Sequence, residues 1–203
     1  MSQSPSASSL FPDHTIEFPD HTIESAPPGA RRSMTATQQH LGYLPAATAR
    51  MAASPHLLDG FIKLNAIFES STLDPVAREA LVMTIATRNG CRVCVAMHTA
   101  RLTALGVGSD IIAGLRTAGR PEARPLTDER LEAIRVFTLR VLDTTGDVGD
   151  KALRAFLTSG YTSQNALEVV LGIGTYTMST LANRLTGAPL DDQLSAFAWH
   201  PAD

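Results

Sequence analysis

Glycine and proline divide the chain from Thr35 onward into short segments whose apolar residues recur at helical spacing. In the clearest segment, which follows Ser54-Pro55, one broad apolar face is formed by Leu57, Leu58, Phe61, Leu64, Ile67 and Phe68. A stripe with this period is buried against other helices when the chain folds. Because the sequence shows no convincing pair of strands, it predicts an all-α fold in which several helices form a bundle.

Capping and breaking residues set the expected helix limits. Asp74-Pro75 predicts a helix start, since Asp accepts hydrogen bonds from the first turn and Pro is favoured at its first position. The expected helices cover residues 37–43, 46–53, 55–68, 75–89, 92–105, 109–119, 127–146, 150–159 and 163–186. Gly172 and Gly174 lie inside the last of these, where each costs about 1 kcal/mol relative to Ala. They indicate close helix packing or an oligomer interface, with a slight kink as the alternative.

Residues 1–33 are rich in Ser, Pro and Ala and show no amphipathic period, which predicts a disordered N-terminal tail. Within this tail a heptapeptide occurs twice in tandem, at residues 11–17 and 18–24. Two copies are too few for a solenoid, and we attribute the repeated histidines to the duplication rather than to a metal site. Residues 34–203 are expected to form one helical domain, with residues 194–199 packed on its surface.

The composition excludes several classes of function. Of the 203 residues, 44% are hydrophobic and 18% are charged, and the net charge is −3. No basic stripe is present, which argues against a nucleic-acid partner. No apolar run reaches membrane-spanning length and no secretory signal is evident, so we expect neither a membrane partner nor export. Two closely spaced cysteines in such a chain suggest a cytoplasmic location, where the pair is catalytic more often than structural.

Both cysteines lie in one short motif, Cys91-x-x-Cys94, which is followed by His98. Asn89-Gly90 predicts a helix stop directly before the motif, so the cysteines begin a new helix. At a helix start, unpaired N–H groups and the macrodipole favour a thiolate over a thiol. His98 follows the cysteines by seven and four positions, which places all three side chains on one helical face.

This arrangement predicts a redox-active dithiol, because the second sulfur can close a disulfide with the first and the imidazole can take a proton. One alternative is a pair of small, inert, buried cysteines beside a histidine with satisfied hydrogen bonds. A zinc site is a second alternative, although the chain has no second Cys pair or paired histidines to complete four ligands. The shared face of the three residues favours the redox interpretation.

Glu79 lies on the preceding helix, twelve residues before Cys91. From the local pattern alone it is a surface charge next to Arg78. However, the break at Asn89-Gly90 lets the two helices fold against each other and bring Glu79 to His98.

The spacing Glu79, Cys91, Cys94, His98 resembles the core of the alkylhydroperoxidase D-like branch of the carboxymuconolactone decarboxylase superfamily. The resemblance extends over about residues 38 to 200 and includes Leu41-Gly42-Tyr43-Leu44-Pro45, Ser54-Pro55, Leu73-Asp74-Pro75-Val76-Ala77-Arg78-Glu79, Gly106-Val107, Asn183 and Gly187-Ala188-Pro189-Leu190-Asp191. It raises Glu79 from a surface charge to a candidate site residue.

The resemblance implies a thiol-dependent peroxidase that is all-helical and homo-oligomeric, as a dimer, trimer or hexamer. On the family's pattern, Cys94 attacks the hydroperoxide, Cys91 resolves the resulting sulfenic acid, and Glu79 with His98 relays protons. An external dithiol, thioredoxin-like or lipoyl-like, would then reduce the disulfide. The chain carries no flavin or nicotinamide fingerprint, so no cofactor is expected, and no metal.

One position departs from the pattern. Val93 stands where the best-known peroxidase members carry a second histidine, which removes a possible proton shuttle and puts the rate and peroxide specificity in doubt. The same Cys pair therefore also fits a general thiol–disulfide oxidoreductase or redox sensor. A helical scaffold with inert cysteines is a third hypothesis. Lactone decarboxylation is a poor alternative, since the decarboxylase branch generally lacks this Cys pair.

Overall fold

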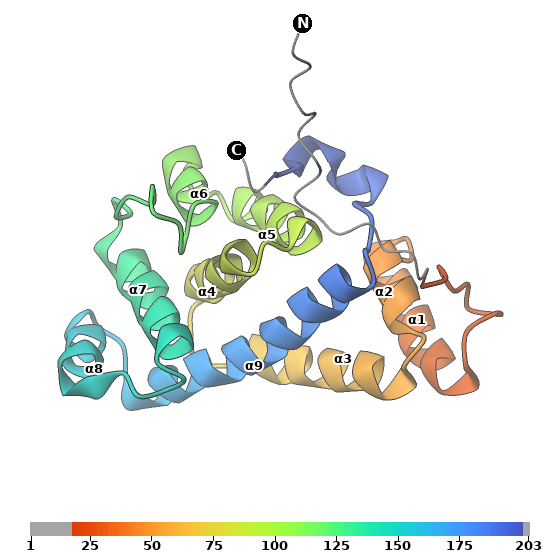
Figure 1. Cartoon of the computed structure of the whole chain (residues 1–203), viewed down its shortest axis with the longest axis horizontal. Helices are drawn as coiled ribbons and strands as arrows, with labels where there is room; N and C mark the ends of the chain where they lie inside the picture. Colours follow the sequence, from red (N-terminus) through yellow and green to blue (C-terminus); the bar gives the residue numbers. More distant parts are fainter. Residues whose placement is uncertain (1–17, 201–203) are drawn as a thin grey trace, which may run out of the picture.

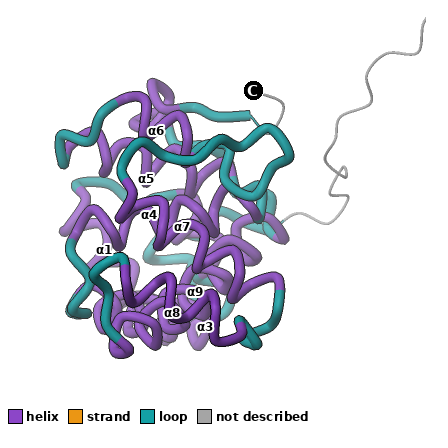
Figure 2. Tube along the Cα trace, turned by 90° about the vertical axis from the view of Figure 1, so that its left-hand side faces the viewer, coloured by secondary structure: helices purple, strands orange, loops and turns teal. Residues whose placement is uncertain are grey.

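The computed structural model describes residues 18–200, and this part of the chain contains helices, turns and loops but no strand, which confirms the predicted all-α fold (Figures 1 and 2). Its helices are α1 (Pro28–Leu41), α2 (Ala46–Met51), α3 (Pro55–Glu69), α4 (Pro75–Arg88), α5 (Arg92–Ala104), α6 (Ser109–Leu115), α7 (Glu129–Asp143), α8 (Gly149–Thr158), α9 (Ser163–Leu185) and the 3-10 helix η1 (Asp192–Phe197).

Helix α4 is the centre of the bundle. It packs against α5, α7 and α9, while the long α9 also packs along α3 (Figure 1). Nearly every residue of α4 from Ala77 to Thr87 is buried, including the carboxylate-bearing Glu79. A helix surrounded in this way places its side chains in the interior on all sides, so Glu79 cannot avoid the core.

The predicted caps explain where the helices of the site begin. The Asp74 side chain accepts a hydrogen bond from the Ala77 N–H at 2.9 Å and starts α4. Gly90 has a φ of 65°, a left-handed conformation that favours glycine, and it turns the chain from α4 into α5. This turn brings the two helices together as the sequence predicted.

Gly172 and Gly174 differ in their surroundings. A Cβ on Gly172 would lie 2.7 Å from both Leu81 Cδ2 and Phe68 Cε2, so α9 approaches α3 and α4 closely at this point. A Cβ on Gly174 would meet no atom within 4 Å. Close helix packing is therefore confirmed for Gly172 but not for Gly174, which is exposed.

Part of the predicted N-terminal tail is folded. The first heptapeptide copy lies outside the described residues, but the second copy lies within them, and its Asp20 accepts a hydrogen bond from Arg50 at 2.7 Å. Helix α1 runs from Pro28 to Leu41 rather than over the expected residues 37–43, because Ala26 and Ala30 are buried in a small apolar cluster with Met34. The sequence of this segment shows no amphipathic period, since small alanine side chains make many of its buried contacts.

The C-terminal segment packs on α5 through η1, as expected, and Trp199 is buried there. Within residues 18–200, no helix combines the length and apolar character that crossing a membrane requires.

Candidate active site

The α4–α5 turn places both cysteines at the start of α5. Cys91 is the N-cap residue, and Cys94 lies in the first turn. Both are free thiols and both are buried, with their sulfurs 3.2 Å apart. At this distance the pair shares a hydrogen bond, and a small rotation of the side chains would be enough to form a disulfide.

His98 and Glu79 are in direct contact, as the helix break at Asn89-Gly90 allowed and the resemblance implied. The His98 Nδ1 lies 2.6 Å from Glu79 Oε2, and both side chains are more than nine-tenths buried. With Glu79 ionised, Nδ1 carries a proton and donates a hydrogen bond to the carboxylate. The Nε2 atom is then the ring nitrogen that can exchange a proton.

A second partner of Glu79 was not predicted from the sequence. Arg101, one turn after His98 on α5, donates to Glu79 Oε1 at 3.1 Å and to Glu69 Oε1 at 3.2 Å. Burial alone raises the pKa of Glu79, but the adjacent His98 and Arg101 outweigh burial and hold this pKa below its ordinary value. The buried carboxylate is therefore kept ionised.

Tyr176 on α9 packs against the buried His98 ring. Its ring lies 5.3 Å from the His98 ring in an edge-on arrangement, and its hydroxyl donates to Asn65 Oδ1 at 2.7 Å. Burial raises the pKa of Tyr176, so the phenol stays protonated and continues to donate to Asn65. The contact adds to the packing around the imidazole.

Helix α9 supplies two polar groups to the sulfurs. Asn183 Nδ2 lies 3.3 Å from the sulfur of Cys94 and 3.8 Å from that of Cys91, and Ser179 Oγ lies 3.9 Å from the sulfur of Cys94. Sequence reasoning placed Asn183 only within the resemblance and gave it no role. Because Asn183 is about ninety residues from the cysteines, no local pattern could connect them.

The two thiols differ in their tendency to ionise. A hydrogen bond with Cys94 lowers the pKa of Cys91, although burial opposes the shift. The same hydrogen bond, together with burial and the charge on Cys91, raises the pKa of Cys94 well above its ordinary value. The sequence predicted that the helix start favours a thiolate, and of the two cysteines it is Cys91 whose thiolate the surroundings favour.

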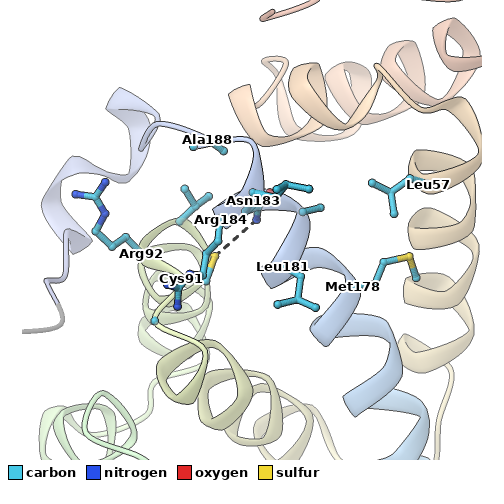
Figure 3. Close-up of a pocket in the computed structure, with 13 residues that line it drawn as sticks. Leu57, Cys91, Arg92, Met178, Leu181, Asn183, Arg184 and Ala188 are labelled. Atoms are coloured by element: carbon cyan, nitrogen blue, oxygen red, sulfur yellow. Dashed lines mark hydrogen bonds between the residues drawn. The ribbon is translucent and has the colours of Figure 1, made fainter. Parts of the chain in front are cut away.

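A groove of about 770 Å³ opens beside the dithiol. Figure 3 shows Cys91 and Asn183 meeting at it, with Met178 and Leu181 on the same helix as Asn183 and Leu57 on α3. Cys91 lines the groove and Cys94 does not. The lining is mostly apolar, so the groove suits a molecule with an apolar body. Among residues 18–200, no three His, Cys, Asp or Glu side chains are grouped to hold a metal ion.

Comparison with known proteins gives one family and several solved folds. Residues 55–123 match the carboxymuconolactone decarboxylase family. No curated protein matches the chain significantly. A peroxidase-related protein from Ralstonia eutropha JMP134, described as an alkylhydroperoxidase AhpD core, is 19% identical with a TM-score of 0.74, over 88% of this chain and 93% of that one.

Two further solved structures are similar. A peroxidase-related protein from Silicibacter sp. TM1040 is 16% identical, with a TM-score of 0.72 over 93% of this chain and 97% of that one. The debrominase Bmp8, solved with 2,3,4-tribromopyrrole, is 15% identical, with a TM-score of 0.65 over 84% of this chain and 89% of that one. The family match over residues 55–123 supports the predicted resemblance to the carboxymuconolactone decarboxylase superfamily, and the solved structures share the fold of this chain.

Proposed function

We propose that this chain, which resembles the alkylhydroperoxidase D-like branch, is a thiol-dependent peroxidase that reduces organic hydroperoxides with its Cys91–Cys94 pair. The observation that carries the proposal is the pair of sulfurs 3.2 Å apart, with the buried His98–Glu79 pair on the same helix hairpin. Members of the superfamily among its structural neighbours include peroxidase-related proteins, which is consistent with this chemistry.

The proposed reaction begins with one negative charge on the dithiol. At rest the charge is favoured on Cys91, whereas the resemblance assigns the attack to Cys94. A proton therefore passes from the Cys94 thiol to the Cys91 thiolate across their 3.2 Å contact before the attack. The transfer requires little movement of the two side chains, because the sulfurs already share a hydrogen bond.

The Cys94 thiolate then attacks the terminal oxygen of the hydroperoxide. A sulfur–oxygen bond forms, the O–O bond breaks, and the sulfur gives two electrons to the peroxide. The proton lost when the dithiol ionised is held at Nε2 of His98, whose orientation is fixed by Glu79, and the leaving alkoxide takes this proton and leaves as an alcohol. The Cys91 thiol next attacks the sulfenic acid, which closes the disulfide and releases water.

Turnover requires an external dithiol. Reduction of the Cys91–Cys94 disulfide takes two electrons and two protons, and a thioredoxin-like or lipoyl-like dithiol can supply both. Because Cys91 lines the groove, it is the sulfur that an incoming thiolate would attack first. The reductant is thus expected to form its mixed disulfide with Cys91.

A general thiol–disulfide oxidoreductase is the second candidate function. The observation that favours it is Val93, an apolar and buried residue at the position where peroxidase members carry a second histidine. Without that histidine the peroxide step has one proton carrier fewer, whereas disulfide exchange at Cys91 does not need it. This function predicts slow loss of thiols with hydroperoxide and rapid exchange with small disulfides.

The test follows thiol loss in one turnover. Reduced protein is mixed with tert-butyl hydroperoxide, and free thiols are counted over time. Cys94→Ser should not react, while Cys91→Ser should react once and accumulate a sulfenic acid that dimedone traps. If Cys94→Ser loses its thiol as fast as the wild type, Cys91 is the attacking sulfur. If the wild type ignores hydroperoxide but exchanges with small disulfides, the second function holds.

We also propose that the protein forms a homo-oligomer through α9. Leu167, Val170, Leu181 and Leu185 are all at least half exposed, and their spacing places them within one narrow stripe of the helix. Sedimentation analysis should show a monomer for Leu181→Glu and an oligomer for the wild type. An unchanged mass would exclude this surface.

A further inference from the structure

Asn183 is the polar side chain placed most closely against the dithiol. It is buried, it lines the groove, and its Nδ2 lies within hydrogen-bond distance of both sulfurs, at 3.3 Å for Cys94 and 3.8 Å for Cys91. An amide N–H₂ group has two donor hydrogens, so both contacts can exist at once.

The oxygen of the same amide gains no hydrogen bond from this orientation. Asn183 Oδ1 is buried and has no hydrogen-bond partner among the described residues. A buried acceptor without a partner is unfavourable and calls for an explanation. The arrangement is explained if the sulfurs carry negative charge, because a donor to an ionised sulfur makes a much stronger hydrogen bond than a donor to a neutral one.

Other charged and titratable groups also surround the sulfurs. Arg184, the next residue on α9, lowers the pKa of Cys91 through its charge, but its guanidinium donates to the backbone carbonyl of Asn89. Tyr176 on α9 and His98 on α5 lie on the Cys94 side of the site. None of these three side chains is seen to hydrogen-bond both sulfurs, whereas Asn183 lies within hydrogen-bond distance of each. Asn183 can therefore stabilise a negative charge on either sulfur.

We propose that Asn183 is a catalytic residue whose amide holds the negative charge of the dithiol on either sulfur while a proton moves between them. This inference rests on the proposed dithiol chemistry but not on hydroperoxide as the oxidant. The amide forms no covalent bond and exchanges no proton. It stabilises the thiolate before attack, and it loses that role once the disulfide has formed and no sulfur is charged.

The role predicts an effect that depends on the redox state. Asn183 favours the reduced, ionised pair over the disulfide, so its loss should make the disulfide relatively more stable. A residue that served packing alone would affect the reduced and oxidised proteins equally. The comparison of the two redox forms within one variant therefore separates charge stabilisation from an effect on folding.

The experiment uses the full chain and three variants. Asn183→Leu removes both polar atoms, and Asn183→Asp keeps the shape but replaces the donor by an acceptor. Thr175→Val is the matched control, because it removes a buried polar group of the same helix whose hydroxyl donates to the backbone carbonyl of Leu171 at 2.8 Å and not to a sulfur. Thiolate is followed by absorbance at 240 nm as a function of pH and by the rate of alkylation with iodoacetamide, neither of which needs a peroxide.

Both Asn183 variants should alkylate at least about tenfold more slowly at neutral pH, with thiolate absorbance shifted to higher pH, while Thr175→Val stays close to the wild type. Equilibration with glutathione should show a disulfide about tenfold more stable, equivalent to a potential about 30 mV lower. Wild-type alkylation rates in both folded Asn183 variants would overturn the proposal, as would equal losses of melting temperature in the reduced and oxidised forms. A chain that shows these effects but reduces no hydroperoxide would keep this inference and refute the peroxidase.

Discussion

Replacing Glu79 by Gln tests whether the buried carboxylate orders the site. The substitution keeps the shape but removes the charge that accepts from His98 at 2.6 Å and from Arg101 at 3.1 Å. Loss of a charged hydrogen bond in the core costs about 1.5–3 kcal/mol. The Arg101 contact adds less than about 1 kcal/mol, because that side chain is 41% exposed and screened by water. Since the amide oxygen of the substituted side chain still accepts weakly, we expect the free energy of unfolding to fall by about 2 kcal/mol.

The effect on chemistry should be larger than the effect on folding. Positioned acid–base groups contribute about 10²–10⁴-fold to a rate, and Glu79→Gln leaves the imidazole present but poorly oriented, so we expect about a 100-fold slower single-turnover oxidation by tert-butyl hydroperoxide. Glu69→Gln is the matched control, since Glu69 binds Arg101 at 3.2 Å but does not touch His98. It should stay within about twofold of the wild-type rate. Equal rates for wild type and Glu79→Gln, in folded protein, would refute the proton relay.

The stability difference should depend on pH with a definite sign. The pKa of Glu79 in the folded protein lies below its ordinary value of 4.5, so folding favours the ionised form. Its contribution is therefore complete above the ordinary pKa and is lost as the pH falls through the folded pKa. Urea denaturation should show the full difference between wild type and Glu79→Gln near neutral pH and a smaller one below about pH 4. A difference that grows in acid would contradict the argument.

Three further outcomes are expected. Gly172→Ala should lower the free energy of unfolding by about 1–2 kcal/mol, because the new Cβ would lie 2.7 Å from two buried side chains, whereas Gly174→Ala should raise it by up to about 1 kcal/mol in urea denaturation. Asp74→Ala should cost about 1 kcal/mol in the same measurement by removing the N-cap of α4. Ultraviolet titration of the folded protein should show Tyr161 ionising near pH 12 and Tyr176 above its ordinary pKa of 10, because burial raises the pKa of each; a full phenolate signal at pH 10 would contradict their burial.

From α2 onward, local sequence signals located the helix starts to within about two residues, whereas the start of α1 was missed. Asp74 caps α4 as predicted. The cap of α7 is Asp128 rather than Thr127, where we expected this helix to begin, since Asp128 accepts from two backbone N–H groups of the first turn. Helix α9 begins at Ser163 as expected, with Thr162 as its cap. Adjacent residues with similar capping ability cannot be separated by propensity, because the tertiary entry angle of the chain decides between them.

The site was predictable only where its residues are close in sequence. The helix stop at Asn89-Gly90 allowed Glu79 to meet His98, but the local pattern alone made Glu79 a surface charge, and only the family resemblance made it a candidate site residue. Arg101 and Asn183 were missed, because an arginine on a helix surface or an asparagine late in another helix carries no local mark of what it will contact. The different ionisation of the two thiols was missed for the same reason, since burial and a sulfur–sulfur hydrogen bond are tertiary properties.

The packing of α9 and the chemistry of the dithiol are connected by the geometry of a single helix. Asn183 lies eleven residues after Gly172, about three full turns, so the two positions share nearly the same face of α9. The close approach at Gly172 sets the distance between α9 and α4. Because α9 is a continuous helix, this distance also determines how far Asn183, near its C-terminal end, lies from the two sulfurs. A side chain at Gly172 should therefore slow alkylation of the thiols as well as lower stability, while Gly174→Ala leaves alkylation unchanged. If Gly172→Ala destabilises the fold but keeps wild-type thiol reactivity, the amide is positioned by local contacts at the end of α9 and not by the helix as a rigid body.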